Sequence, residues 1–83
     1  MEHTAEWKIK LFLFEHDNGS TAQVVLDTGA NTLHGEGHAG QVPDGRAIPE
    51  IDTELAAGRA LTDLGNRLIE IAAADAAEMS VEH

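Results

Sequence analysis

The sequence predicts an α+β domain in which a three-stranded antiparallel meander precedes one long C-terminal helix. Three short segments alternate apolar and polar residues at period two, and clusters of turn-forming residues separate them. A longer C-terminal segment begins with a proline and contains no further proline. Because 83 residues support only one hydrophobic core, we expect a single domain covering residues 1–83.

The three strands are expected at residues 7–14, 21–27 and 32–39. In the first strand one face carries Trp7, Ile9, Leu11 and Leu13, and we expect this face to be buried. The residues expected to face inward from the other two strands are Ala22, Val24, Leu26, Leu33, Gly35, Gly37 and Ala39. The connections between the strands are short, so neighbouring strands should run antiparallel.

The final element is a predicted helix at residues 49–79, which follows a loop at residues 40–48. Pro49 suits the first helical position, where its missing N–H is not needed. At ~1.5 Å per residue the helix would be roughly 45 Å long, whereas an eight-residue strand spans only ~26 Å. We therefore expect the helix to extend beyond the sheet. Its apolar arc covers roughly 200°, wider than one packing surface requires, and Asp52, Arg59, Asp63 and Arg67 lie on the opposite side, which we expect to be solvated.

The composition narrows the classes of function. Fifteen acidic residues against five basic ones give a formal charge of −10 and leave no basic stripe, which argues against nucleic-acid and anionic membrane partners. The chain contains no cysteine, so disulfides and thiolate metal sites are excluded. We find no signature of a cofactor or of a catalytic site. The N-terminal residues lack the pattern of a signal peptide, so we expect a soluble, cytoplasmic protein.

The order of these elements resembles a known family. The matching residues are Trp7, Ile9, Leu11, Leu13 and Glu15, then Thr21, Ala22, Val24 and Leu26, then Leu33, Gly35, Gly37 and Ala39, and finally Pro49-Glu50-Ile51, Glu54-Leu55-Ala56-Ala57, Arg59-Ala60-Leu61 and Asp63-Leu64. They resemble a small actinobacterial family of unknown function. The resemblance implies a fold similar to the double-stranded-RNA-binding domain, here β-β-β-α without the N-terminal helix. RNA-binding members of that fold carry a Lys-rich cluster where this helix begins, but this chain has Glu50, Asp52 and Glu54 there.

Two groups of residues are candidates for chemistry. His34, Glu36 and His38 project from one face of the third strand, and two imidazoles with a carboxylate are plausible metal ligands. However, residues i and i+4 of a strand lie ~13 Å apart, so one ion would bind Glu36 with one histidine but hardly both, and a solvated sheet face is the simpler interpretation. Glu54 lies near the middle of the apolar arc, where it is either an acid–base candidate or a first-turn acid that satisfies backbone N–H groups or meets Arg46.

Two further predictions concern the packing of the helix on the sheet and the sheet face turned away from it. Gly35 and Gly37 on the strand, with Gly58 and Gly65 on the helix, are expected to allow close approach of the helix to the sheet. The candidate interaction surface is formed by Phe12, Phe14 and Val25, on the sheet face turned away from the helix.

The preferred hypothesis is a non-enzymatic interaction module whose partner is itself, as a homo-oligomer, or another protein, without nucleic acid, membrane or cofactor. The first alternative is a small-ligand or metal binder, or an enzyme, built on Glu54 or on His34, Glu36 and His38. The second alternative is an RNA binder, suggested by the resemblance in fold.

Overall fold

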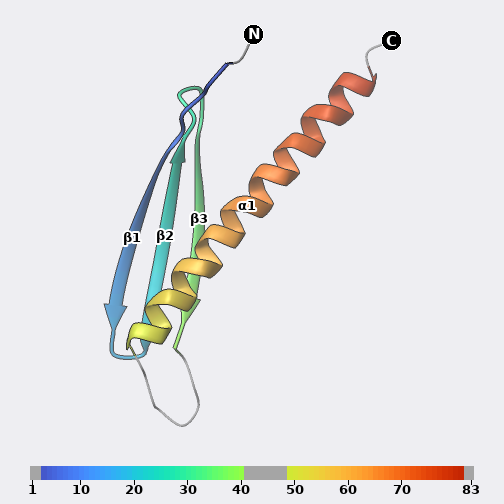
Figure 1. Ribbon diagram of the computed structural model, residues 1–83. Coiled ribbons are helices and arrows are strands. Elements are labelled where there is room, and N and C mark those ends of the chain that lie inside the picture. The colour runs from blue at the N-terminus through green and yellow to red at the C-terminus, as the bar shows by residue number, and fades with distance from the viewer. Residues whose placement is uncertain (1–2, 41–48, 82–83) are drawn as a thin grey trace.

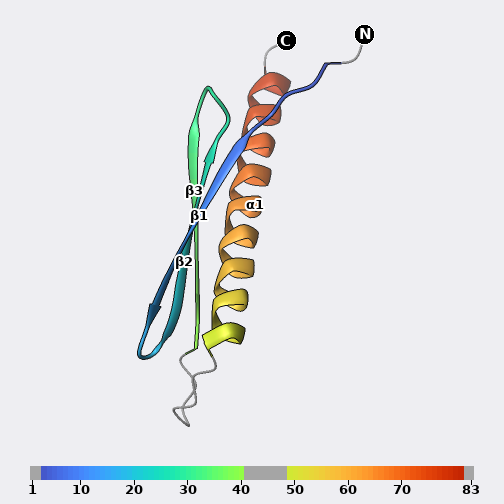
Figure 2. The same ribbon diagram turned by 60° about the vertical axis from the view of Figure 1, so that its left-hand side comes forward.

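The structure, a computed structural model, describes residues 3–40 and 49–81 and contains the four expected elements (Figure 1). They are β1 (Lys8–His16), β2 (Gly19–Asp27), β3 (Thr32–Ala39) and α1 (Pro49–Val81). The strands form one antiparallel sheet in the order β1-β2-β3, and α1 packs on one side of it as a second layer (Figure 2). The predicted fold class, a meander followed by one long helix, is therefore confirmed. The predicted loop at residues 40–48 lies, apart from Gly40, outside the described residues.

The strand boundaries differ from the prediction at the first hairpin. Strand β1 begins at Lys8 rather than Trp7 and continues to His16, which pairs with Gly19. Only Asp17 and Asn18 connect the two strands. Gly19 has a φ of +137°, a conformation that glycine adopts without steric cost. Each of the two strands thus extends two residues further into the hairpin than the polar cluster indicated.

The contact between α1 and the sheet depends on small residues. A Cβ atom on Gly35 would lie 2.5 Å from the carbonyl oxygen of Ala60, and a Cβ on Gly37 would lie 2.8 Å from the Cβ of Arg59. On the helix, Ala56 and Ala60 are fully buried. The predicted close approach is confirmed for the two strand glycines. It is wrong for Gly58 and Gly65 of the helix, where an added Cβ would meet no other atom within 4 Å.

The helix lies over β3 and β2, so the expected burial of β1 is wrong. All nine residues of β1 are exposed. Ile9, Leu11 and Leu13 do share the helix-facing side with Leu26, Val24 and Ala22, their partners in β2, but they keep 55%, 42% and 44% of their surface exposed. Among the described residues the hydrophobic core consists of Ala22, Val24, Leu26, Ala39, Ala56, Ala60 and Leu64.

The predicted overhang takes the form of a divergence, because the C-terminal half of α1 leaves the sheet at an angle (Figure 1). The molecule measures 58 × 27 × 18 Å along its principal axes. In this half of the helix, Ile69 and Met79 are 68% and 76% exposed. Asp52 was expected on the solvated side of the helix, but this prediction is wrong, because its side chain is buried at 7% exposure. Among the described residues, no helix has the length and hydropathy that a membrane span needs.

Candidate functional site

The most prominent surface feature is an apolar area along β1, which we call the β1 surface and define as Ile9, Leu11, Phe12, Leu13 and Phe14. Phe12 and Phe14 are 46% and 49% exposed, and their partners in β2 are Gln23 and Thr21. They lie on the sheet face turned away from α1, as predicted.

Val25, the third member of the predicted interaction surface, lies on the same face as Phe12 and Phe14 and is half-buried. The structure thus brings the three predicted residues onto one face. It adds Ile9, Leu11 and Leu13 on the opposite face of β1, which sequence reasoning had assigned to the core.

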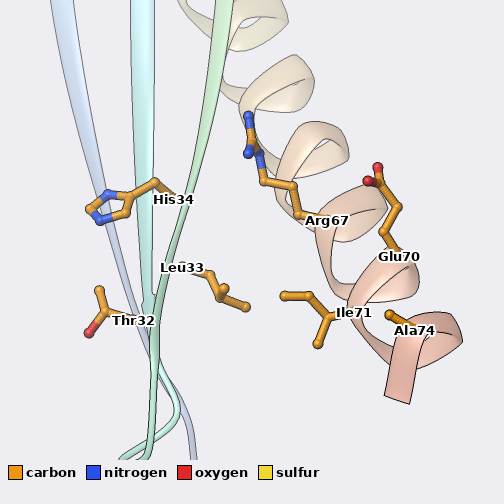
Figure 3. Close-up of a pocket in the computed structure, with 7 residues that line it drawn as sticks. All are labelled: Thr32, Leu33, His34, Arg67, Glu70, Ile71 and Ala74. Atoms are coloured by element: carbon orange, nitrogen blue, oxygen red, sulfur yellow. The ribbon is translucent and has the colours of Figure 1, made fainter. Parts of the chain in front are cut away.

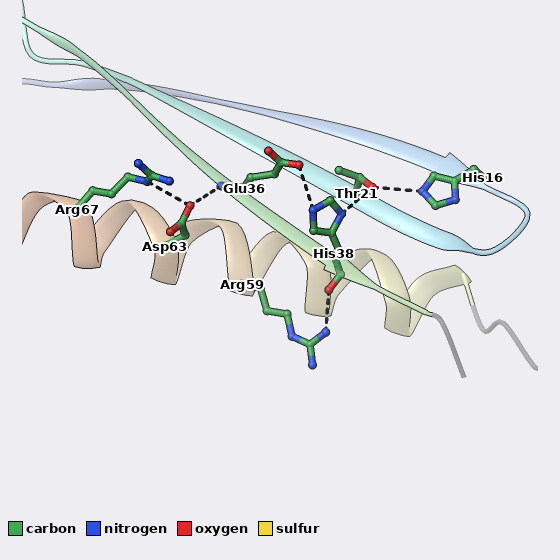
Figure 4. Close-up of polar contacts among 7 residues, drawn as sticks. All are labelled: His16, Thr21, Glu36, His38, Arg59, Asp63 and Arg67. Carbon is green, nitrogen blue, oxygen red and sulfur yellow. Dashed lines mark hydrogen bonds and ion pairs between the residues drawn. The ribbon is translucent and has the colours of Figure 1, made fainter. Parts of the chain in front are cut away.

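The two edges of the sheet differ in how their backbone groups are satisfied. At the β3 edge, side chains of α1 hydrogen-bond to the strand: the Glu36 N–H donates to Asp63 Oδ2 at 2.9 Å, and Arg59 Nη1 donates to the His38 carbonyl oxygen at 2.7 Å (Figure 4). Arg67 Nε donates to the same Asp63 oxygen at 3.3 Å. At the β1 edge, no residue of 3–40 or 49–81 makes an equivalent contact. A strand edge of this kind is a template for pairing with another strand.

The bonds to Asp63 change its acidity. The N–H of Glu36 stabilises the carboxylate form most strongly and the guanidinium of Arg67 adds to it, so the pKa of Asp63 lies below its ordinary value near 3.8, although partial desolvation opposes the shift. The ionised form is therefore the one that covers the β3 edge.

The predicted metal-ligand row belongs to a chain of surface hydrogen bonds. His38 Nε2 lies 3.0 Å from Glu36 Oε1, and His38 Nδ1 lies 3.2 Å from Thr21 Oγ1, which in turn lies 3.2 Å from His16 Nε2 (Figure 4). One assignment satisfies every contact: His16 donates to Thr21, Thr21 donates to His38, and His38 donates to Glu36. His34 does not take part in these contacts. Within the described residues, no three histidine, aspartate or glutamate side chains are placed to hold one metal ion.

Glu54 does not occupy the buried position that its acid–base role required. The side chain is exposed, because the part of the helix that packs on β3 and β2 is centred on Ala56, Ala60 and Leu64. The suggested contact with Arg46 lies outside the described residues.

A hollow of about 560 Å³ lies between β3 and the C-terminal half of α1, where the helix diverges from the sheet. It is lined by Thr32, Leu33, His34, Arg67, Glu70, Ile71 and Ala74 (Figure 3). Leu33 and Ile71 point toward each other across it, whereas Thr32 and His34 lie on the other side of the strand from the helix. The polar groups of its lining thus do not converge on one point, as they do in most small-molecule sites.

The exposed side of β1 could have been found from the sequence. Gly35 and Gly37 both lie on the third strand, an outer strand of a meander, and the helix approaches most closely where side chains are absent. Their position therefore indicates that the helix axis is displaced toward β3. A helix displaced toward the third strand leaves the first strand without cover.

Known proteins resemble this chain in both sequence and structure. The family model described as Rv2632c-like matches residues 5–83. Two uncharacterized mycobacterial proteins, Mb1767 of Mycobacterium bovis and MT1780 of Mycobacterium tuberculosis, are each 35% identical over 69 residues, which is 83% of this chain and 73% of theirs. The crystal structure of Rv2632c matches with a TM-score of 0.79 and 29% identity over 100% of this chain and 99% of that one.

These findings confirm the resemblance to an actinobacterial family of unknown function. The likeness to the double-stranded-RNA-binding domain stays a prediction. The chain belongs to the Rv2632c-like family.

Proposed function

We propose that this protein is a non-enzymatic interaction module that associates with a second copy of itself through the β1 surface. The observation that carries the proposal is the area that one chain leaves exposed. It exposes 6669 Å², whereas a compact monomer of 8.8 kDa is expected to expose about 4,800 Å². The radius of gyration of 16.9 Å likewise exceeds the roughly 12 Å expected for a compact domain of this length.

This excess is large enough for a specific interface. A stable protein–protein contact buries about 800 Å² on each partner, and the chain exposes roughly 1,900 Å² more than a compact monomer would. Part of the excess area comes from the C-terminal half of α1, where Ile69 and Met79 are exposed. The β1 surface adds five large apolar side chains that are each 42% to 55% exposed. Burying them would supply the hydrophobic stabilisation that a core rich in alanine lacks.

The negative charge of the chain opposes both nucleic-acid binding and self-association, so self-association demands an apolar contact. Two chains of formal charge −10 repel each other, so their association has to come from buried apolar area and strand pairing rather than from ion pairs. Salt screens this repulsion, and the affinity should therefore rise with ionic strength. RNA binding would show the opposite dependence on salt.

The test is the oligomeric state, measured by sedimentation equilibrium from about 0.05 to 0.5 M NaCl, where the Debye length changes several-fold. We expect a dimer that is stabilised by salt. The double variant Phe12→Ser/Phe14→Ser should be a folded monomer by far-UV circular dichroism. The matched control Ile69→Ser/Met79→Ser removes two even more exposed apolar side chains from α1 and should stay dimeric. A wild-type monomer at all salt concentrations would contradict the proposal, as would a dimer that only the helix variant dissociates.

A further inference from the structure

We infer that the second copy extends the sheet by pairing its β1 antiparallel to this β1 around a two-fold axis at Leu11, which gives one continuous six-stranded sheet. The inference rests on the proposed self-association and states its geometry. It starts from the difference between the two sheet edges. Asp63 and Arg59 already bind two of the outward backbone groups of β3, the Glu36 N–H and the His38 carbonyl oxygen, so the edge that is open to a second chain is β1.

The hydrogen-bonding alternation identifies which residues of β1 face the open edge. In an antiparallel sheet the backbone groups of successive residues point alternately to the two neighbouring strands. Glu36 and His38 direct theirs outward from β3, as their bonds to α1 show. From the register of the three strands, the residues of β1 that direct their N–H and C=O groups outward are Ile9, Leu11, Leu13 and Glu15.

The apolar pattern then selects the register. Two copies of β1 related by a two-fold axis must pair outward-facing residues with one another. When the axis passes Leu11, each Ile9 lies opposite the partner's Leu13, and the two Leu11 residues lie opposite each other. A shift by one pairing step would instead place Ile9 opposite the partner's Glu15, an acid against an aliphatic side chain. A shift by one step in the other direction would place the two Lys10 residues opposite each other, where like charges repel. The register centred on Leu11 avoids both, because it keeps Ile9, Leu11 and Leu13 opposite one another on the helix-facing side and places Glu15 at the end of the junction, opposite the partner's Trp7.

The other face of the junction supports the antiparallel arrangement. In the same register Lys10 lies opposite the partner's Phe12, and Lys8 lies opposite the partner's Phe14. A lysine over the face or edge of an aromatic ring covers apolar surface with its methylene groups and is attracted to the ring. A parallel arrangement in register would place each lysine beside its own copy, where like charges repel.

Disulfide trapping tests this geometry, because the chain has no cysteine of its own. Opposite residues of a hydrogen-bonded antiparallel pair have Cα atoms about 5.5 Å apart, inside the range that a disulfide spans. Leu11→Cys should therefore form a covalent dimer on mild oxidation. Ile9→Cys and Leu13→Cys should each stay uncrosslinked alone and should crosslink when mixed. Gln23→Cys, an exposed residue of the central strand, is the control for random collision.

A measurement on the unchanged protein guards against variants that fail to fold. If the edge is paired, the amide protons of Ile9, Leu11 and Leu13 exchange slowly with solvent in the dimer and rapidly when dilution gives monomers. A wild-type dimer in which these amides exchange rapidly and Leu11→Cys does not crosslink would overturn the strand pairing but leave self-association intact. Crosslinking of Gln23→Cys as readily as Leu11→Cys would also overturn it. A wild-type monomer would remove both proposals.

Discussion

Replacing Gly37 by alanine should destabilise the domain, whereas the same replacement at Gly58 should stabilise it. An alanine Cβ at position 37 would press on the carbonyl oxygen of Ala56 and on the backbone nitrogen of Ala60, so α1 has to move away from β3. Overpacking of this kind costs about 1–3 kcal/mol. At position 58 the added Cβ meets nothing within 4 Å, and the helix gains about 0.5–1 kcal/mol from the better helix former.

The assay is thermal unfolding followed by circular dichroism at one fixed protein concentration, since association would make the melting temperature depend on concentration. For a domain of 60–100 residues, 1 kcal/mol shifts the melting temperature by about 4–8 °C. Gly37→Ala should therefore lower it by about 5–20 °C, and Gly58→Ala should raise it by about 2–8 °C. Equal or higher stability of Gly37→Ala would refute the close approach of α1 to β3. A loss of stability in Gly58→Ala would show that the helix is packed differently.

Two further predictions concern the contact between α1 and the sheet. Asp63→Asn should reduce the free energy of unfolding at neutral pH. Because the pKa of Asp63 is lowered in the folded state, the charged carboxylate stabilises the fold above about pH 4, and this contribution is lost as the pH falls through the lower folded value. The difference between wild type and variant in urea unfolding should therefore be constant above about pH 5 and shrink below about pH 4, and a difference independent of pH would count against the role of the charge. Leu64→Ala should cost about 2–5 kcal/mol in urea unfolding, because Leu64 is 3% exposed, whereas Ile69→Ala at 68% exposure should change little.

The sequence predicted which elements form but not where the helix lies on the sheet. Period-two alternation and turn residues placed the three strands because both are local properties of the chain. The lateral position of α1 depends on contacts between residues far apart in sequence, such as Gly37 with Ala56, and the alternation of apolar residues does not encode it. For the same reason Asp52 was assigned to solvent although it is buried, and Glu54 to the packed side although it is exposed.

The candidate surface was predicted in part. Phe12 and Phe14 were placed on the uncovered face from alternation alone, because register in a meander follows from short turns. Leu11 and its neighbours on the other face were missed because an apolar alternating strand is expected to be covered by the only helix available. The hydrogen bonds from Asp63 and Arg59 to the backbone of β3 could not be predicted either, since they depend on how far α1 is displaced toward that strand.

The position of the helix connects the packing of the domain to its proposed assembly. A helix with side chains is about 10 Å across, and neighbouring strands lie about 4.8 Å apart, so a helix centred over β2 would reach all three strands. Glycines on β3 instead draw α1 toward one edge, which brings Arg59 and Asp63 within reach of the backbone of β3 and leaves β1 without cover. When two β1 strands pair, the edges left in the dimer are the two β3 edges, where side chains of α1 already bind the Glu36 N–H and the His38 carbonyl oxygen. The same displacement that opens one edge thus closes the other, so the proposed association ends at two chains instead of continuing into a fibre.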